Sequence, residues 1–297
     1  MSATPAIPVP AAARWWAYVV LTKPDVTFLV AITTLAGFYL GSPAAVDFVR
    51  LANAVIGTLM IAGGTSALNQ YFERNQDAVM RRTARRPLPS GVLEPGEALR
   101  FGVGLALAGA LYLGVACNWL AAALGVATSA SYLGAYTPLK KRTTWATFVG
   151  AFPGAVPPLI GWAAATGRLD AGAWVLFAIL FAWQFPHFFA IAWMYREDYA
   201  RAGIKMLPVV DASGDRTFRQ ILAYSAALIP ISMLPAAMGL AGVHYFFGAL
   251  VLSMMLMQVA IWSSKERTNL RAKWLMHATV IHIPLLFALL IFDRIHP

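Results

Sequence analysis

Long apolar segments recur along this chain, and short polar segments separate them. Nine of them come close to the ~20 residues that a helix needs to cross a bilayer. Lipid leaves no partner for exposed backbone groups, so each segment is predicted to be a helix. The predicted spans are 24–42, 51–71, 99–117, 119–137, 146–165, 171–194, 220–241, 243–263 and 274–292. We therefore expect an all-α polytopic membrane protein, with nine transmembrane helices in one bundle around a central cavity.

The composition supports this class and excludes others. Of the 297 residues, 59% are hydrophobic and only 12% are charged, about half the charged fraction of a soluble domain. A net charge of +10 would suit a nucleic-acid partner, but the charges lie in the short loops between apolar segments. A lipid bilayer is therefore the expected partner. We expect residues 1–22 to form a cytoplasmic tail and residues 23–297 a single transmembrane domain.

The basic residues predict an orientation, because Lys and Arg concentrate in cytoplasmic loops. With the N-terminus in the cytoplasm, 20 of the 23 Lys and Arg residues fall in the cytoplasmic segments. Only Arg50, Arg168 and Arg294 fall outside, together with the C-terminus. Residues 1–13 lack the basic start of a signal peptide. A bacterial inner membrane is the expected location.

The first polar region follows the apolar segment 51–68. If the helix continues, Asn69, Glu73 and Asp77 are spaced at i, i+4 and i+8 along one face. Oxygen ligands suit Mg²⁺, which is often bound together with substrate phosphates. Arginines follow in the chain, and guanidinium groups pair well with phosphate oxygens. A cytoplasmic loop with solvated charges is the alternative, and this region alone does not decide between the two.

A second polar region begins inside the span 171–194. Gln184 and His187 are neighbours at i and i+3, and Asp198 follows His187 by 11 residues, about three helical turns. A continuous helix would place Asp198 on the face of His187. Polar side chains at membrane depth point by default into a cavity; a helix-packing hydrogen bond is the alternative for His187.

The two long cytoplasmic loops, 72–98 and 195–219, share an order of acidic residues, basic residues and Leu-Pro. This weak internal repeat predicts that the loops meet at one end of the bundle. A third region runs from Tyr136 through Lys140 into residues 150–161, which contain three prolines and three glycines. Such a segment is predicted to be a broken helix that lines a cavity or is buried in protein.

Together these motifs resemble the UbiA superfamily of intramembrane prenyltransferases, from about Thr22 to Asp293. The first signature is Asn69-x-x-x-Glu73-x-x-x-Asp77 with a following Arg-Arg-Pro-Leu. Other motifs resemble the branch that farnesylates protohaem, the haem O synthases. These motifs are Trp183-Gln184-x-Pro186-His187-Phe188, Glu197-Asp198-Tyr199 with Gly203-Ile204-x-Met206-Leu207-Pro208, Tyr136-Thr137-x-Leu139-Lys140 and Pro157-Pro158-Leu159-Ile160-Gly161-Trp162. The chain departs from the superfamily at Gln70, Glu73 and Tyr195, where aspartates are common, so the number of metal ions stays open.

The resemblance implies a reaction and a division of roles. Farnesyl diphosphate would be the donor and a vinyl group of protohaem IX (haem B) the acceptor, giving hydroxyethylfarnesyl haem O for haem–copper oxidases. A downstream haem O hydroxylase, haem A synthase, is an implied partner. The catalytic and Mg²⁺-binding candidates are Asn69, Glu73, Asp77 and Asp198. The diphosphate-binding candidates are Lys23, Arg81, Arg85, Arg86, Lys140 and Lys205. Gln184 and His187 are the haem-binding candidates.

Some alternatives stay open. His187 would contact haem either by ligating the iron or by bonding a propionate, and the sequence does not decide which. Another acceptor, a quinone precursor or chlorophyllide, would use the same chemistry. A non-catalytic transporter would also contain broken helices and repeats. However, the carboxylates here gather at the cytoplasmic surface, where a water-soluble diphosphate would arrive.

Overall fold

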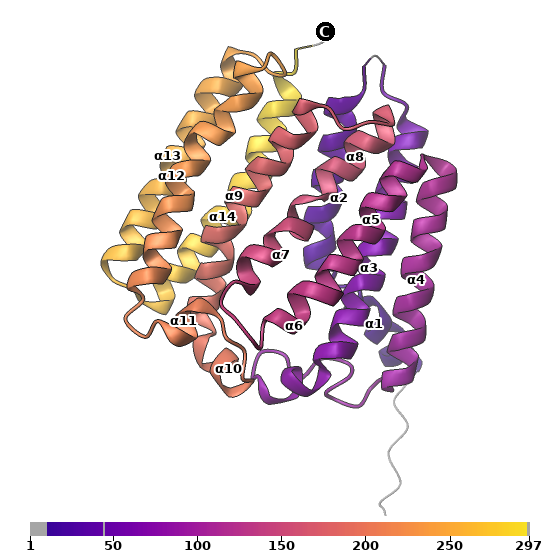
Figure 1. The fold of residues 1–297 in the computed structure, drawn as a ribbon, viewed down its shortest axis with the longest axis vertical. Helices are drawn as coiled ribbons and strands as arrows, with labels where there is room; N and C mark the ends of the chain where they lie inside the picture. The colour runs from indigo at the N-terminus through magenta and orange to yellow at the C-terminus, as the bar shows by residue number, and fades with distance from the viewer. Residues whose placement is uncertain (1–10, 44, 296–297) are drawn as a thin grey trace, which may run out of the picture.

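The computed structural model describes residues 11–43 and 45–295, and this part of the chain is almost entirely helical (Figure 1). The predicted all-α class is therefore confirmed. The elements are α1 Ala11–Leu21, α2 Pro24–Gly41, α3 Phe48–Val79, α4 Pro95–Ala116, α5 Trp119–Ser131, a π-helical turn Tyr132–Tyr136, α6 Thr137–Leu139, α7 Ala146–Ala155, α8 Pro157–Thr166, α9 Ala171–Met194, α10 Arg196–Arg201, α11 Leu207–Val210, α12 Asp215–Ala237, α13 Val243–Lys265 and α14 Asn269–Phe292.

Eight helical segments in the described residues are long and apolar enough to cross a membrane, with α7 and α8 counted as one. The segment predicted at 119–137 is helical, but the π-helical turn divides it into pieces too short to count. The number of nine spans therefore stays a prediction.

The proline- and glycine-rich segment is broken, as predicted, between α7 and α8 at Val156. Glycine lets α8 approach α2 very closely, since a Cβ atom on Gly161 would lie 2.0 Å from the carbonyl oxygen of Thr34. Figure 1 shows α9, α12, α13 and α14 on one side of the bundle, α2, α3, α4, α5 and α8 on the other, and α7 between them. The broken segment lies largely in protein: α8 is buried from Pro157 to Ala164, and α7 buries most of its residues but leaves Phe152 exposed.

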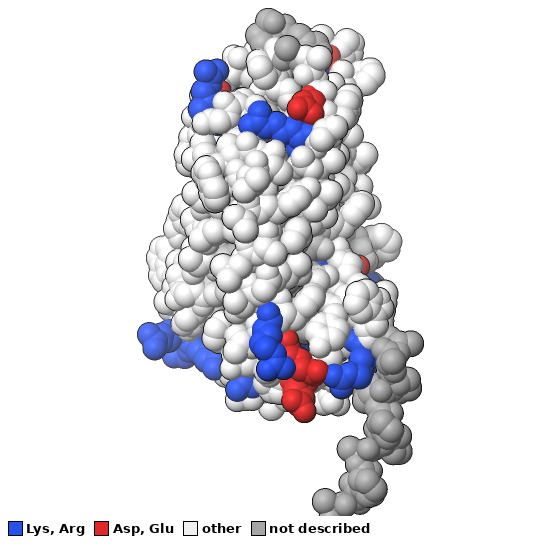
Figure 2. Space-filling view, turned by 90° about the vertical axis from the view of Figure 1, so that its right-hand side faces the viewer, with Lys and Arg blue, Asp and Glu red and all other residues white. Residues whose placement is uncertain are grey.

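The two ends of the bundle carry the charges. Figure 2 shows a broad band without charged residues between charged groups at the two ends of that face. At one end lie α1, α6, α10 and α11. At the other, the guanidinium group of Arg294, just after α14, donates to the carbonyl oxygens of Tyr39 and Ser42 at the end of α2. The first helix and the end of α14 thus lie at opposite ends of the molecule.

Two helix ends decide where the polar residues lie. Helix α3 has 32 residues and continues through Asp77, as predicted; at 1.5 Å per residue it is about 48 Å long, well beyond the ~30 Å hydrocarbon core. Helix α9, in contrast, ends at Met194, because Tyr195 leaves the helical conformation (φ −108°, ψ 20°). The prediction of one continuous helix from His187 to Asp198 was wrong. Asp198 instead lies in the first turn of α10.

Candidate active site

Three polar side chains, each one turn apart near the end of α3, contact a cation from another part of the chain. The pairs are Asn69 Oδ1 with Lys23 Nζ at 3.0 Å, Glu73 Oε1 with Lys140 Nζ at 2.8 Å and Asp77 Oδ2 with Arg86 Nη1 at 2.8 Å. The cations come from the start of α2, from the segment after α6 and from the loop after α3. We call these six residues the ion-pair row, in which two contacts are ion pairs and Lys23 donates to the neutral amide of Asn69.

The ion-pair row is poorly accessible to water. Asn69 and Asp77 are each only 1% exposed, and one nitrogen of Arg86 contacts both oxygens of Asp77, at 2.9 and 2.8 Å. A buried carboxylate without a partner would be strongly destabilising, so the pairing compensates its desolvation. The hydroxyl of Thr83 also donates to the carbonyl oxygen of Asp77 and holds the loop that carries Arg86.

The second acidic region comes to the same place. Asp198, 8% exposed, accepts a hydrogen bond from the backbone N–H of Arg82 at 3.2 Å. It also pairs with the guanidinium group of Arg201. The backbone N–H of Lys205 donates to the carbonyl oxygen of Lys140 at 2.7 Å. The predicted convergence of the two long loops is therefore confirmed.

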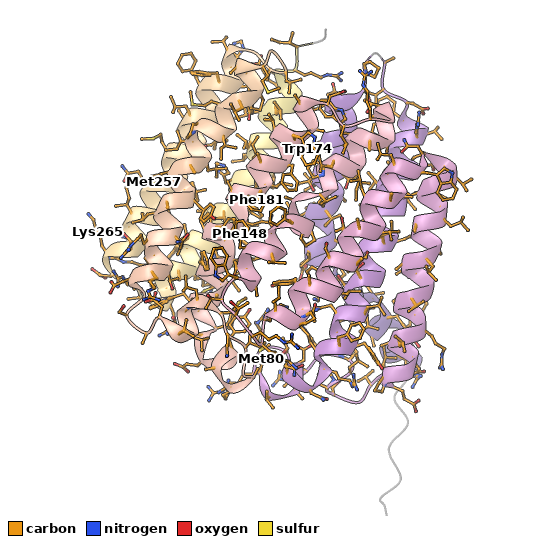
Figure 3. All side chains as sticks on the ribbon, in the orientation of Figure 1. Met80, Phe148, Trp174, Phe181, Met257 and Lys265 are labelled. Carbon is orange, nitrogen blue, oxygen red and sulfur yellow. The ribbon has the colours of Figure 1, made fainter. Side chains whose placement is uncertain are left out.

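Apolar contacts also join the two loops. Met80, just after α3, packs with Tyr199, Ile204 and Met206 from the α10–α11 region. Figure 3 shows Met80 at the end of the bundle where α6, α10 and α11 lie. Met80 thus forms one small core with residues that lie 119 or more positions further along the chain, and this core joins the two loops.

The structure separates the predicted diphosphate ligands into two groups. Lys23, Lys140 and Arg86 lie in the ion-pair row. Arg81 and Arg85 are exposed, and neither forms an ion pair with a described residue. The side chain of Lys205 is exposed as well, and only its backbone contacts the site. The geometry therefore favours the first three as phosphate ligands.

Sequence analysis missed three groups that support the site. Thr137 accepts a hydrogen bond from Asn69 Nδ2 at 3.3 Å; its place in the Tyr-Thr-Pro-Leu-Lys motif was the available signal. Arg201 follows Asp198 at i+3, a spacing at which side chains on one helix meet. The backbone N–H of Arg82 has no sequence signal, since any residue but proline supplies one.

Lys23 combines an unusual backbone conformation with a perturbed charge. It has a φ of 51°, the one positive value among the non-glycine residues that the structure describes. The left-handed conformation costs a residue with a Cβ atom about 1–2 kcal/mol, and it turns the Lys23 side chain toward Asn69. Loss of hydration, and then the charges of Arg86 and Lys140, lowers the pKa of Lys23 to about 7, although Glu73 and Asp77 act in the opposite direction. A bound anion would stabilise the protonated amine.

The two haem-binding candidates lie on different faces of α9. Gln184 is 3% exposed, and its Nε2 donates to the carbonyl oxygen of Ala151 in α7 at 3.0 Å. It thus forms a helix-packing bond, and its role toward haem stays a prediction. His187 is half-buried and faces α14, where its Nδ1 lies 2.8 Å from the hydroxyl of Thr279. Phe181, about one turn before Gln184 on α9, also contacts α7, where it packs edge-on against Phe148 (Figure 3).

The oxygen ligands fit Mg²⁺ only in combination with a substrate. Among the described residues, no three His, Cys, Asp or Glu side chains form a group that could hold a metal ion. Mg²⁺ is, however, usually bound by one or two carboxylates together with substrate phosphates. Asn69, Glu73, Asp77 and Asp198 offer that kind of ligand set. We infer that they suit an ion that a diphosphate helps to hold.

A cavity of about 360 Å³ opens beside Glu73. Its lining includes the apolar side chains of Phe72 and Leu133 and the polar groups of Thr137 and Lys141. A larger cavity of about 530 Å³ between α1 and α4 includes none of the ion-pair row. Of these two cavities, only the smaller one borders the ion-pair row, through Glu73.

Comparison with known proteins decides the family. Residues 30–287 match the model of the UbiA prenyltransferase family. The chain belongs to this family. It is 51% identical to the protoheme IX farnesyltransferase of Solibacter usitatus (strain Ellin6076), covering 93% of this chain and 98% of that protein. It is 46% identical to the protoheme IX farnesyltransferase of Koribacter versatilis (strain Ellin345), covering 93% of each chain.

Solved structures of UbiA proteins share the fold. A digeranylgeranylglyceryl phosphate synthase has a TM-score of 0.77 at 16% identity, covering 95% of this chain and 98% of that one. A UbiA homologue from Archaeoglobus fulgidus bound to DMAPP and Mg²⁺ has a TM-score of 0.60 at 16% identity, covering 92% and 98%. At these identities the likeness establishes a common fold.

Proposed function

We propose that this UbiA protein transfers the farnesyl group of farnesyl diphosphate to a vinyl group of haem B, giving haem O. The observation that carries the proposal is the ion-pair row together with Asp198, where two distant loops meet at the end of an apolar bundle. Relatives at 51% and 46% identity named protoheme IX farnesyltransferase support haem as the acceptor over a quinone precursor or chlorophyllide.

In the proposed reaction, the diphosphate takes over the cations of the ion-pair row. Lys23, Lys140 and Arg86 would turn from their partners on α3 to phosphate oxygens, since charge-assisted bonds to phosphate are strong. The oxygens they leave on Asn69, Glu73 and Asp77, with those of Asp198, would hold Mg²⁺. The ion would supply Lewis-acid stabilisation of the leaving diphosphate. Because these charges are already in place, little reorganisation accompanies cleavage.

The bond changes follow from this arrangement. The C–O bond between the farnesyl C1 and the diphosphate breaks, and the electron pair leaves with the diphosphate. The haem vinyl group attacks the allylic cation, which forms a C–C bond and leaves a cation on the porphyrin side. Water adds to that cation and loses a proton. The product is haem B plus the elements of farnesol.

We also propose nine spans with the ion-pair row facing the cytoplasm of a bacterium and the protein in its inner membrane. The distribution of 20 of 23 basic residues supports this orientation. The position of α1 at the same end as α10 and α11 agrees with it. Farnesyl diphosphate, which has a water-soluble head, would then reach the site from the cytoplasm. A haem A synthase that takes over the product belongs to the same proposal.

The test is incubation of the protein in lipid nanodiscs with haem B, farnesyl diphosphate and Mg²⁺. We expect mass spectrometry to find a pigment heavier by the elements of farnesol and a colorimetric assay to find released pyrophosphate. The Asp198→Asn variant, matched in size, should lose most of both signals. An unmodified pigment, alongside prenylation of a quinone precursor or chlorophyllide offered in parallel, would contradict the choice of acceptor.

A further inference from the structure

His187 is held by contacts with two residues, Thr279 and Trp183. Its Nδ1 lies 2.8 Å from Thr279 Oγ1 across the α9–α14 interface. The indole of Trp183, one turn earlier on α9, stacks on the imidazole at 4.9 Å between ring centroids and 14° between planes. Trp183 Nε1 in turn donates to the carbonyl oxygen of Thr279 at 2.8 Å. Thr279 therefore anchors both the imidazole and the ring that stacks on it.

The hydrogen bonds of Thr279 decide where the imidazole proton lies. A threonine hydroxyl has one proton to donate, and that of Thr279 goes to the carbonyl oxygen of Met276 at 2.6 Å. Toward His187 the hydroxyl can then only accept, so Nδ1 carries the proton. Among the residues that the structure describes, a histidine pairs with a carboxylate only at His244 and Asp293, at the other end of α14. His187 is therefore a neutral imidazole with its lone pair on Nε2.

Nε2 of His187 is only partly covered by protein. It has no hydrogen-bond partner among the described residues, but it is not enclosed by protein. His282, one turn further along α14, gives the contrast. Its Nε2 also lacks a described partner, but that atom is fully enclosed and the residue is 3% exposed. Of these two histidines on neighbouring helices, only His187 has an Nε2 that is not fully enclosed.

We propose that Thr279 is a positioning residue that holds His187 with Nε2 free to ligate the iron of the haem substrate. This inference rests on the proposed function. A neutral imidazole nitrogen is an ordinary axial ligand of haem iron, whereas an unprotonated Nε2 has no hydrogen to give to a propionate. The geometry thus selects iron ligation from the two contacts that the sequence left open. The Nδ1–H bond to Thr279 orients the ring and raises the basicity of Nε2.

The experiment measures haem binding in the absence of farnesyl diphosphate. We would titrate the protein in nanodiscs with haem B, follow the Soret band, and record the iron–histidine stretch of the ferrous complex by resonance Raman spectroscopy. His187→Gly should lose the histidine-ligated spectrum, and added imidazole should restore it. Thr279→Val should weaken haem affinity about 10-fold or more, the usual effect of losing a partner of a ligating histidine. It should also lower the iron–histidine frequency, and Thr279→Ser should restore both.

A matched control separates positioning from packing. Thr128→Val removes a hydroxyl that bonds only within its own helix, to the Leu124 carbonyl oxygen, and should leave affinity and frequency unchanged. The inference is overturned if the wild type shows no histidine ligation, if His187→Gly retains it, or if Thr279→Val changes neither quantity. Failure of the proposed function is distinguishable: the wild type would then bind haem through His187 but form no farnesylated product with Mg²⁺ and farnesyl diphosphate.

Discussion

The charged end of α3 and the interface between α9 and α14 hold their polar groups by different kinds of interaction. At the end of α3, Glu73 faces the positive charge of Lys140, and Asp77 faces that of Arg86 in the loop that follows α3. At the α9–α14 interface, His187 and Trp183 make neutral hydrogen bonds to a single residue of the neighbouring helix. The first region is organised by charge and the second by the direction of individual hydrogen bonds.

The difference follows from what each region would bind. A diphosphate brings several negative charges, so its site needs cations that are already desolvated and fixed. A haem iron needs one neutral nitrogen with a free lone pair, and an extra charge at membrane depth would be costly. The two regions should therefore respond independently to changes in metal ions, charges and packing.

Removal of Mg²⁺ should give the largest difference in response between the two regions. With EDTA, we expect transfer and pyrophosphate release to fall below detection, because the diphosphate leaves without Lewis-acid stabilisation. The haem spectrum should stay unchanged, since no group near His187 needs a divalent ion. The measurement is product formation and the Soret titration on the same sample. Farnesyl transfer at an undiminished rate in EDTA would exclude the proposed metal role.

Asp77→Asn should have the next largest effect. The substitution keeps the size of the side chain but removes the charge that pairs with Arg86. We expect a loss of about 100-fold or more in kcat for transfer, as for the removal of one preorganised group from an active site, with haem affinity unchanged. The control is Asp215→Asn, which removes an exposed acid paired with Arg267. If both variants keep full activity, the ion-pair row is not the reaction site.

Features that depend on residues close together in the chain could be predicted from the sequence, whereas features that depend on how the chain changes direction could not. The row of Asn69, Glu73 and Asp77 follows from helix periodicity alone, and α3 continues as expected. The break between α7 and α8 follows from local proline and glycine content. The position of Asp198 could not be predicted in this way, because one residue, Tyr195, leaves the helical conformation and redirects the chain.

Hydrogen-bonding groups that tertiary contacts bring to the site could not be predicted from the sequence either. The backbone N–H of Arg82 and the hydroxyl of Thr279 reach the site only because loops and helices far apart in the chain pack together. The sequence also could not distinguish among the arginines of the loop after α3. Arg81, Arg85 and Arg86 look alike in sequence, but only Arg86 joins the ion-pair row.

Gly154→Ala should disturb the interior while sparing the charged end. A Cβ atom on Gly154 would lie 2.0 Å from Gln184 Oε1, so Gln184 would have to move and weaken its bond to Ala151. We expect destabilisation of about 1–3 kcal/mol, typical of overpacking, measured as a lower thermal unfolding midpoint in detergent. Gly104→Ala, whose new Cβ atom would have nothing within 4 Å, is the control. Equal midpoints for the two variants would show that α7 and α9 are loosely packed here.

Arg85→Gln should have the smallest effect and tests the division among the arginines. Its side chain is exposed and has no ion pair among the described residues, so its charge is screened by water and salt. We expect the Kd for farnesyl diphosphate to rise by less than about 3-fold, in line with the ~0–1 kcal/mol of exposed charge pairs. Arg86→Gln should raise it far more, because it also leaves Asp77 buried without its partner. Isothermal titration with farnesyl diphosphate and Mg²⁺ compares the two variants directly. Similar losses for both would mean that the loop after α3 closes over the diphosphate and brings Arg85 into contact with it.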